Sequence, residues 1–219
     1  MAGMIRISPD ALRAAAERYM MVNATIEEAG ARLKDLASQL DASWDGGASR
    51  AALDKIQDLI VAVGDAAETS SGTSSMLKGV AQAFESFDAG NSSFIAPWSG
   101  VIDMLGRITL RCPPGGIGGI LRALYHFDGS MRIEPDAVRA VAYGCKVVAD
   151  DLREAAQEII AQADGLASQW EGNAYNRFRE QSNNIRASFM QIADHIDEFA
   201  SETIESANRY EELDNTFFA

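Results

Sequence analysis

The segment IRISPDALRAAA (residues 5–16) recurs as MRIEPDAVRAVA (residues 131–142), 126 positions later in the chain. From Arg6 to Ala16, eight of the eleven positions are identical in the two segments. The offset continues without a gap through four further pairs: Trp44 and Trp170, Gly46 and Gly172, Phe84 and Tyr210, and Asp88 and Asp214. Self-similarity at one fixed offset indicates that the chain contains two copies of a single structural unit.

The repeat divides the chain into three predicted parts, which are two copies of one unit at 1–88 and 131–219 and a linker at 89–130. With 219 residues, of which 47% are hydrophobic, the chain can bury a core as one domain or as two packed modules. Apolar residues recur at spacings of three and four, which is typical of a coiled-coil seam. In the first copy the seam comprises Leu12, Ala15, Tyr19, Val22, Ile26, Ala29, Leu33, Leu36 and Leu40.

Each seam stops at a Trp-x-Gly sequence, Trp44-Asp45-Gly46 in the first copy and Trp170-Glu171-Gly172 in the second. Since glycine adopts positive φ without a Cβ penalty, each glycine is predicted to cap the end of a helix. The tryptophan before it is predicted to cover the end of the seam. The helical period then resumes, so each copy is predicted to be a helical hairpin. The run TSSGTSSMLKG (residues 69–79) has low helix propensity and is expected to be the softest part of its helix.

Hairpins with Trp-x-Gly in the turn and Tyr-x-x-x-Asp near the C-terminus resemble the WxG family of small proteins related to the early secreted antigenic target. Members of that family are exported by type VII secretion systems of Gram-positive bacteria and mycobacteria. Tyr210 and Asp214 fit the second motif, and the resemblance extends over both repeats. It implies a composite secretion signal, built from Tyr210, Asp214, Trp44 and Gly46, that the membrane ATPase of the secretion system reads.

The chain departs from the family pattern in two ways. Family members are usually single hairpins that dimerise, whereas two are fused here, which implies a monomer with an internal pseudo-dimer. The first copy also has phenylalanine where the family has tyrosine, so its end is a degenerate second signal. That second signal comprises Phe84, Asp88, Trp170 and Gly172.

The uncovered side of each hairpin predicts how the two copies assemble. Each large apolar side chain left in water loses roughly 1.5–3 kcal/mol of burial free energy. The second copy can bury the uncovered apolar side of the first, and because both are on one chain, its effective concentration is about a millimolar. Family dimers imply an antiparallel arrangement, and a linker of 42 residues spans a helix length on the order of 50 Å easily. The predicted fold is all-α, with two hairpins packed antiparallel as an intramolecular four-helix bundle and a partly helical linker.

The linker is too apolar for a solvated tether, and short helices are expected around 98–108 and 117–126. Its arginines make it locally basic on an acidic protein. Two roles stay open for it: packing along its own bundle, or docking a partner or a membrane. The predicted contact residues for a partner are Trp98, Leu105 and Leu124.

Composition argues against several classes of function. The net charge is −13, with 32 acidic and 19 basic residues, which disfavours nucleic acid and anionic lipid as partners. Cys112 and Cys145 fit either two free thiols or one bridge. His126 and His195 are the only histidines, and no cluster has metal-ligand spacing. Neither enzymatic activity nor a cofactor or metal is expected.

Three functional hypotheses follow. The first is a non-enzymatic type VII substrate, made in the cytoplasm and secreted without a classical signal peptide, since the N-terminus has no apolar run of the required kind. The second is a cytosolic adaptor or targeting partner for a larger exported toxin. The third is a membrane-active effector, for which an acidic surface is unfavourable. A co-secreted helical protein is a further partner that the resemblance implies.

Overall fold

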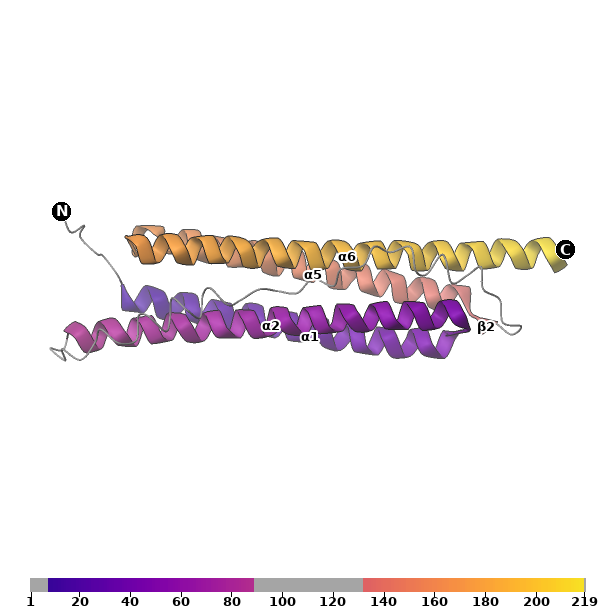
Figure 1. Cartoon of the computed structure of the whole chain (residues 1–219), viewed down its shortest axis with the longest axis horizontal. Coiled ribbons are helices and arrows are strands. Elements are labelled where there is room, and N and C mark those ends of the chain that lie inside the picture. The colour runs from indigo at the N-terminus through magenta and orange to yellow at the C-terminus, as the bar shows by residue number, and fades with distance from the viewer. Residues whose placement is uncertain (1–7, 89–131, 219) are drawn as a thin grey trace. The chain divides into compact units, whose positions relative to one another are not determined.

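The computed structural model describes residues 8–88 and 132–218. Most of these residues lie in the helices α1 (Pro9–Ser43), α2 (Gly47–Asp88), α5 (Pro135–Gly165) and α6 (Asn173–Phe218) (Figure 1). The short elements are β1 (Trp44–Asp45), β2 (Arg132–Ile133) and the 3₁₀ helix η1 (Leu166–Ser168). The prediction of an all-α fold, in which two hairpins pack antiparallel as a four-helix bundle, is confirmed. The helices expected in the linker, and its residues Trp98, Leu105, Cys112 and Leu124, lie outside the described residues.

Capping at the hairpin turns differs from the prediction in one respect. Gly46 and Gly172 have φ values of 121° and 113°, and they are the residues with positive φ in the described part of the chain. The first helix of each hairpin ends before its turn glycine, α1 at Ser43 and α5 at Gly165. The carbonyl of each turn glycine accepts the first hydrogen bond of the following helix, at 3.2 Å in both turns. Each glycine is therefore the N-cap of the second helix and not the C-cap of the first.

The serine-rich run at 69–79 is helical throughout, because α2 continues through it without a break. Its low helix propensity is offset by tertiary hydrogen bonds to the backbone of α1. Ser70 Oγ donates to the carbonyl of Tyr19 at 3.1 Å, and Ser74 Oγ donates to the carbonyl of Ala16 at 2.8 Å. Both serines are fully buried. A composition that indicates a weak helix thus serves here to hold α2 close against α1.

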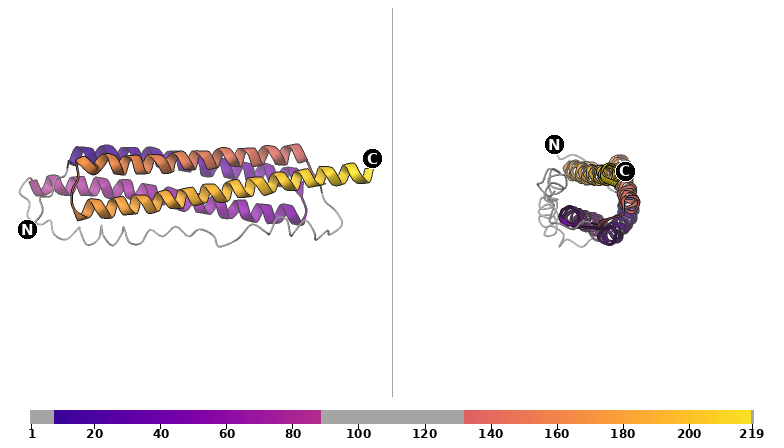
Figure 2. Two further views of the ribbon diagram at one scale, coloured as in Figure 1. Left: turned by 90° about the horizontal axis from the view of Figure 1, so that it is seen from above. Right: turned by 90° about the vertical axis from the view of Figure 1, so that its right-hand side faces the viewer.

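The described chain divides into two compact units, and each unit takes one segment from every long helix. Figure 2 shows the same long helices from two further directions. Each unit contains the turn of one hairpin together with the two free ends of the other hairpin. The first unit comprises residues 8–26, 65–88 and 154–189, and the second comprises 27–64, 132–153 and 190–218.

In each unit a backbone hydrogen bond joins the turn of one hairpin to the start of the other. In the second unit the N–H of Glu134 donates to the carbonyl of Ser43 at 2.8 Å. In the first unit the N–H of Ser8 donates to the carbonyl of Gln169 at 3.0 Å. The repeat offset of 126 converts Ser8 to Glu134 and Ser43 to Gln169. Reciprocal contacts of this kind arise when two similar hairpins pair with each other through the same surface.

The cores of the two units differ in the size of matching side chains. In the first unit Tyr19 is fully buried, its hydroxyl lies 3.1 Å from Ser182 Oγ, and its ring packs edge-on against Phe178. The repeat places Cys145 and Ile56, both fully buried in the second unit, at the positions equivalent to Tyr19 and Ser182. A large and a small residue at these two positions of the first unit are thus replaced by a small and a large residue at the equivalent positions of the second.

This size matching predicts non-additive mutant stabilities. Ser182→Ile should overpack against Tyr19 and lower the free energy of unfolding by about 1–3 kcal/mol. Tyr19→Cys should leave a cavity that costs about 3–5 kcal/mol. The double variant copies the pair of the second unit into the first, so its loss should be smaller than the sum of the single losses. Urea unfolding followed by circular dichroism measures all three, and additive losses would contradict the matching.

Candidate functional site

The second unit contains the predicted signal residues, because it holds both the turn of the first hairpin and the end of α6. Trp44 and Gly46 lie at that turn, and Tyr210 lies near the end of α6. Asp214 also lies in α6, although its side chain is outside those described.

The predicted degenerate signal falls in the first unit. Phe84 lies near the end of α2, and Trp170 and Gly172 lie at the turn of the second hairpin. Asp88 is the last residue of α2, and its side chain is outside those described. Each unit therefore holds one Trp-x-Gly turn and the tail of the other hairpin.

Both tryptophans are part of the core. Trp44 is 1% exposed and Trp170 is 3% exposed. Trp44 pairs with Ile133 in the β1–β2 ladder, and Ser49 Oγ donates to its carbonyl at 2.6 Å. The ring of Trp170 packs on Phe178, with 5.3 Å between the ring centroids. Because so little of either ring reaches solvent, a partner protein has almost no indole surface to contact at these turns.

The exposed part of the first turn is Asp45. Its Oδ1 accepts a hydrogen bond from the N–H of Gly46 at 2.7 Å. Gly46 itself is buried, and its positive φ allows the chain to reverse into α2. Trp44 and Gly46 therefore shape the turn, while Asp45 is the side chain that the turn presents to solvent.

The tail of α6 presents a mixed surface. Tyr210 is half-buried, and this burial raises the pKa of its phenol above the ordinary value. Glu211, Glu212 and Leu213 are exposed, and Leu213 is one of the most exposed large apolar residues among those described. Asp214 follows Tyr210 by four residues, so the two positions share one face of the helix.

Arg139 joins this tail to the start of α5. Its Nη1 donates to Asn208 Oδ1 at 3.0 Å and to Glu211 Oε2 at 2.9 Å. Its Nη2 donates to Asp136 Oδ1 at 2.7 Å. The hydrogen bonds to Glu211 and Asp136 raise the pKa of the Arg139 guanidinium above its ordinary value. Since β2 directly precedes α5 and pairs with β1, Arg139 connects the tail to the element that adjoins the Trp44 turn.

The first unit repeats this arrangement with residues of the first hairpin. Arg13 forms ion pairs with Asp10 at 3.2 Å and with Glu85. Adding the offset of 126 converts these three residues to Arg139, Asp136 and Glu211. The arginine was absent from the predicted site, although it stands in the most similar segment of the repeat. The distance between an arginine and a tail 72 residues away depends on the register of two helices, which a seam pattern does not specify.

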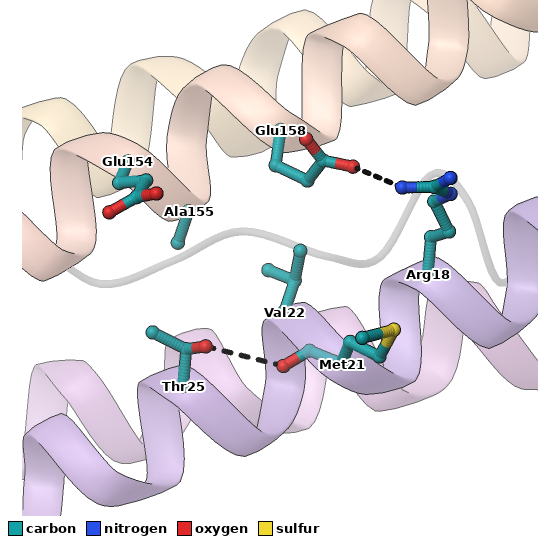
Figure 3. Close-up of a pocket in the computed structure, with 7 residues that line it drawn as sticks. All are labelled: Arg18, Met21, Val22, Thr25, Glu154, Ala155 and Glu158. Carbon is teal, nitrogen blue, oxygen red and sulfur yellow. Dashed lines mark hydrogen bonds and ion pairs between the residues drawn. The ribbon is translucent and has the colours of Figure 1, made fainter.

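A separate pocket of about 320 Å³ lies between α1 and α5 in the first unit (Figure 3). Arg18 and Glu158 face each other across it, with 3.6 Å between their charged groups. The other lining residues are Met21, Val22, Thr25, Glu154 and Ala155. This lining contains neither cysteine nor histidine.

Within 8–88 and 132–218, no three or more histidine, cysteine or acidic side chains are grouped so that they could hold a metal ion. Over the same residues, no helix is both long enough and apolar enough to cross a membrane.

The fold and the turns define a class of protein, made of helical hairpins with a Trp-x-Gly turn that pack in pairs. The family model of WXG100, described as proteins of 100 residues with WXG, matches residues 4–89 and again residues 130–215. The two matches cover most of the chain, which therefore belongs to the WXG100 family as a tandem member. No match was found among curated proteins or among solved structures. Membership implies a small helical protein that works with type VII secretion machinery.

The burial of Trp44 predicts that its replacement acts mainly on stability. Trp44→Ala should lower the free energy of unfolding by about 3–5 kcal/mol, because it removes a large side chain from the core. Trp170→Ala is the matched variant at the other turn and should behave in the same way. Chemical denaturation measures both losses. A Trp44→Ala protein with the unfolding midpoint of the wild type would show that the ring contributes little to the core.

Proposed function

We propose that this chain is a non-enzymatic substrate of a type VII secretion system, recognised through a composite of the Trp44 turn and the Tyr210 tail. Its membership of the WXG100 family supports the class of function. The composite rests on one observation, the Arg139 bridge from the tail to the start of α5, which the β1–β2 pair joins to the turn.

The four proposed signal residues have different roles. Trp44 and Gly46 are buried, so they act by giving the turn its shape. Tyr210 is half-buried on an exposed tail, and it is proposed as a residue that the membrane ATPase of the secretion system contacts. Asp214, on the same face of α6, is proposed as its companion. Recognition through the tail therefore depends on the turn only indirectly.

Fusion of the two hairpins provides one complete signal in a single chain. The first hairpin supplies the turn and the second supplies the tyrosine, a division that single hairpins achieve by dimerising. At the other end, Phe84 lacks the hydroxyl, and Phe84 and Asp88 with Trp170 and Gly172 form a degenerate copy. The protein would be made in the cytoplasm and delivered outside the cell, alone or with a co-secreted helical protein.

Export of matched tail variants tests this proposal. Tyr210→Ala and Asp214→Ala should each reduce the fraction of protein in the culture supernatant at least tenfold. Phe84→Ala, at the position that the repeat relates to Tyr210, should be exported as well as the wild type. Circular dichroism of each purified variant checks that the helices remain folded.

Normal secretion of both folded tail variants would disprove the composite signal. A wild-type protein that stays in the cytoplasm, bound to a larger exported protein, would instead support the role of adaptor or targeting partner. Immunoblots of cell and supernatant fractions, with a cytoplasmic marker as a lysis control, distinguish these results.

A further inference from the structure

We infer that Arg139 is a positioning residue of the export signal, which holds the last turns of α6 in a fixed orientation next to the Trp44 turn. The inference rests on the proposed function and names a residue outside the Trp-x-Gly and Tyr-x-x-x-Asp motifs. Arg139 acts through the tail, since its side chain is only 19% exposed and its donors are directed at neighbouring side chains.

The tail needs an anchor because the core ends before it. Ala207 is the last buried residue of α6 among those with described side chains. Residues 208–213 are exposed or half-buried, so apolar packing contributes little to their placement. Asn208 and Glu211, which accept hydrogen bonds from Arg139, lie on either side of Tyr210 in the sequence. The anchor is therefore at the segment that carries the proposed contact residue.

The geometry of the guanidinium fixes an orientation as well as a distance. Its planar group directs several N–H donors in set directions, unlike the single rotatable ammonium of lysine. With Asn208 and Glu211 directed at Arg139, helical geometry turns Tyr210 about 100° away from Glu211 around α6. The tyrosine is thus left off the clamped face of the helix. Loss of Arg139 should therefore leave both the orientation and the position of the last turns of α6 unrestrained.

The other side of Arg139 is tied to the turn. Asp136, in the first turn of α5, accepts from Nη2 of Arg139. The residue before α5, Glu134, donates its N–H to the carbonyl of Ser43, the last residue of α1. A continuous series of contacts therefore runs from the Trp44 turn through the start of α5 to Arg139 and on to Glu211.

These bonds should matter more for orientation than for overall stability. Asp136 and Glu211 have side chains that are 98% and 54% exposed, and ion pairs with exposed partners contribute little to global stability. Removal of Arg139 is therefore expected to leave the bundle folded while the end of α6 becomes mobile. Because overall stability and the mobility of the α6 end should respond differently, a positioning role of Arg139 can be measured.

Arg13 provides an internal control. It makes the equivalent pairs with Asp10 and Glu85 at the tail of the first hairpin. That tail carries Phe84 where the second carries Tyr210. Loss of Arg13 should loosen a tail that is not the proposed signal, and should leave export unchanged.

The experiment compares full-length Arg139→Met with Arg13→Met in the secreting host. Arg139→Met should reduce export at least fivefold and speed amide hydrogen exchange at 209–213. Arg13→Met should be exported like the wild type, with faster exchange confined to 83–86. Arg139→Lys, which keeps the charge without the planar donors, should give an intermediate export level. Arg139→Gln serves as a second neutral variant if the methionine variant does not fold.

Two results would overturn the inference. Wild-type export of a folded Arg139→Met protein, with export lost in Tyr210→Ala, would remove the positioning role and leave the proposed function intact. Reduced export without faster exchange at 209–213 would show that Arg139 is contacted directly and does not act through the tail. Normal export of Tyr210→Ala itself would mean that the proposed function has failed, whatever Arg139 does.

Discussion

The hydrogen bond from Glu134 to the carbonyl of Ser43 determines how the two hairpins meet. Ser43 ends α1, and the last carbonyls of a helix have no partner within it. Here the partner is supplied by the segment that leads into the other hairpin. The same exchange occurs between Ser8 and Gln169, so the turn of each hairpin is completed by the start of the other. The same two contacts fix which end of one hairpin lies beside the turn of the other within each unit.

Fusion of two copies allows the core to become asymmetric. In a pair of identical hairpins, the same side chains would stand at both equivalent positions, and a large residue would meet the same neighbour twice. In this chain Tyr19 and Ser182 of the first unit are replaced by Cys145 and Ile56 at the equivalent buried positions of the second. The asymmetry extends to the tails, where Tyr210 of the second copy is at the position equivalent to Phe84 of the first. One chain can therefore carry a tyrosine in one tail and a phenylalanine at the equivalent position of the other.

The sequence predicts those features that depend on local or periodic information. The repeat and the apolar seam predict the hairpins and their pairing, and Gly46 and Gly172 are correctly predicted to need positive φ. The role of these glycines as N-caps was not predicted, because the pattern does not show that α1 stops at Ser43. Helix propensity counts only the local cost at 69–79, whereas Ser70 and Ser74 also donate hydrogen bonds to the backbone of α1. The bridge from Arg139 to the tail of α6 was not predicted either, because it depends on the register of two helices, which the seam pattern does not specify.

An engineered disulfide most directly tests whether the turn of the first hairpin lies beside the start of the second. Asp45 and Arg132 are opposite each other in the antiparallel β1–β2 pair, where Cα atoms lie about 4.5–5.5 Å apart, a separation that a disulfide spans. The variant Asp45→Cys with Arg132→Cys is made with Cys112→Ser and Cys145→Ala, and its mass is measured with and without reductant. An intrachain disulfide in a monomer is expected. A disulfide only between chains, or none under oxidising conditions, would contradict the intramolecular antiparallel pairing.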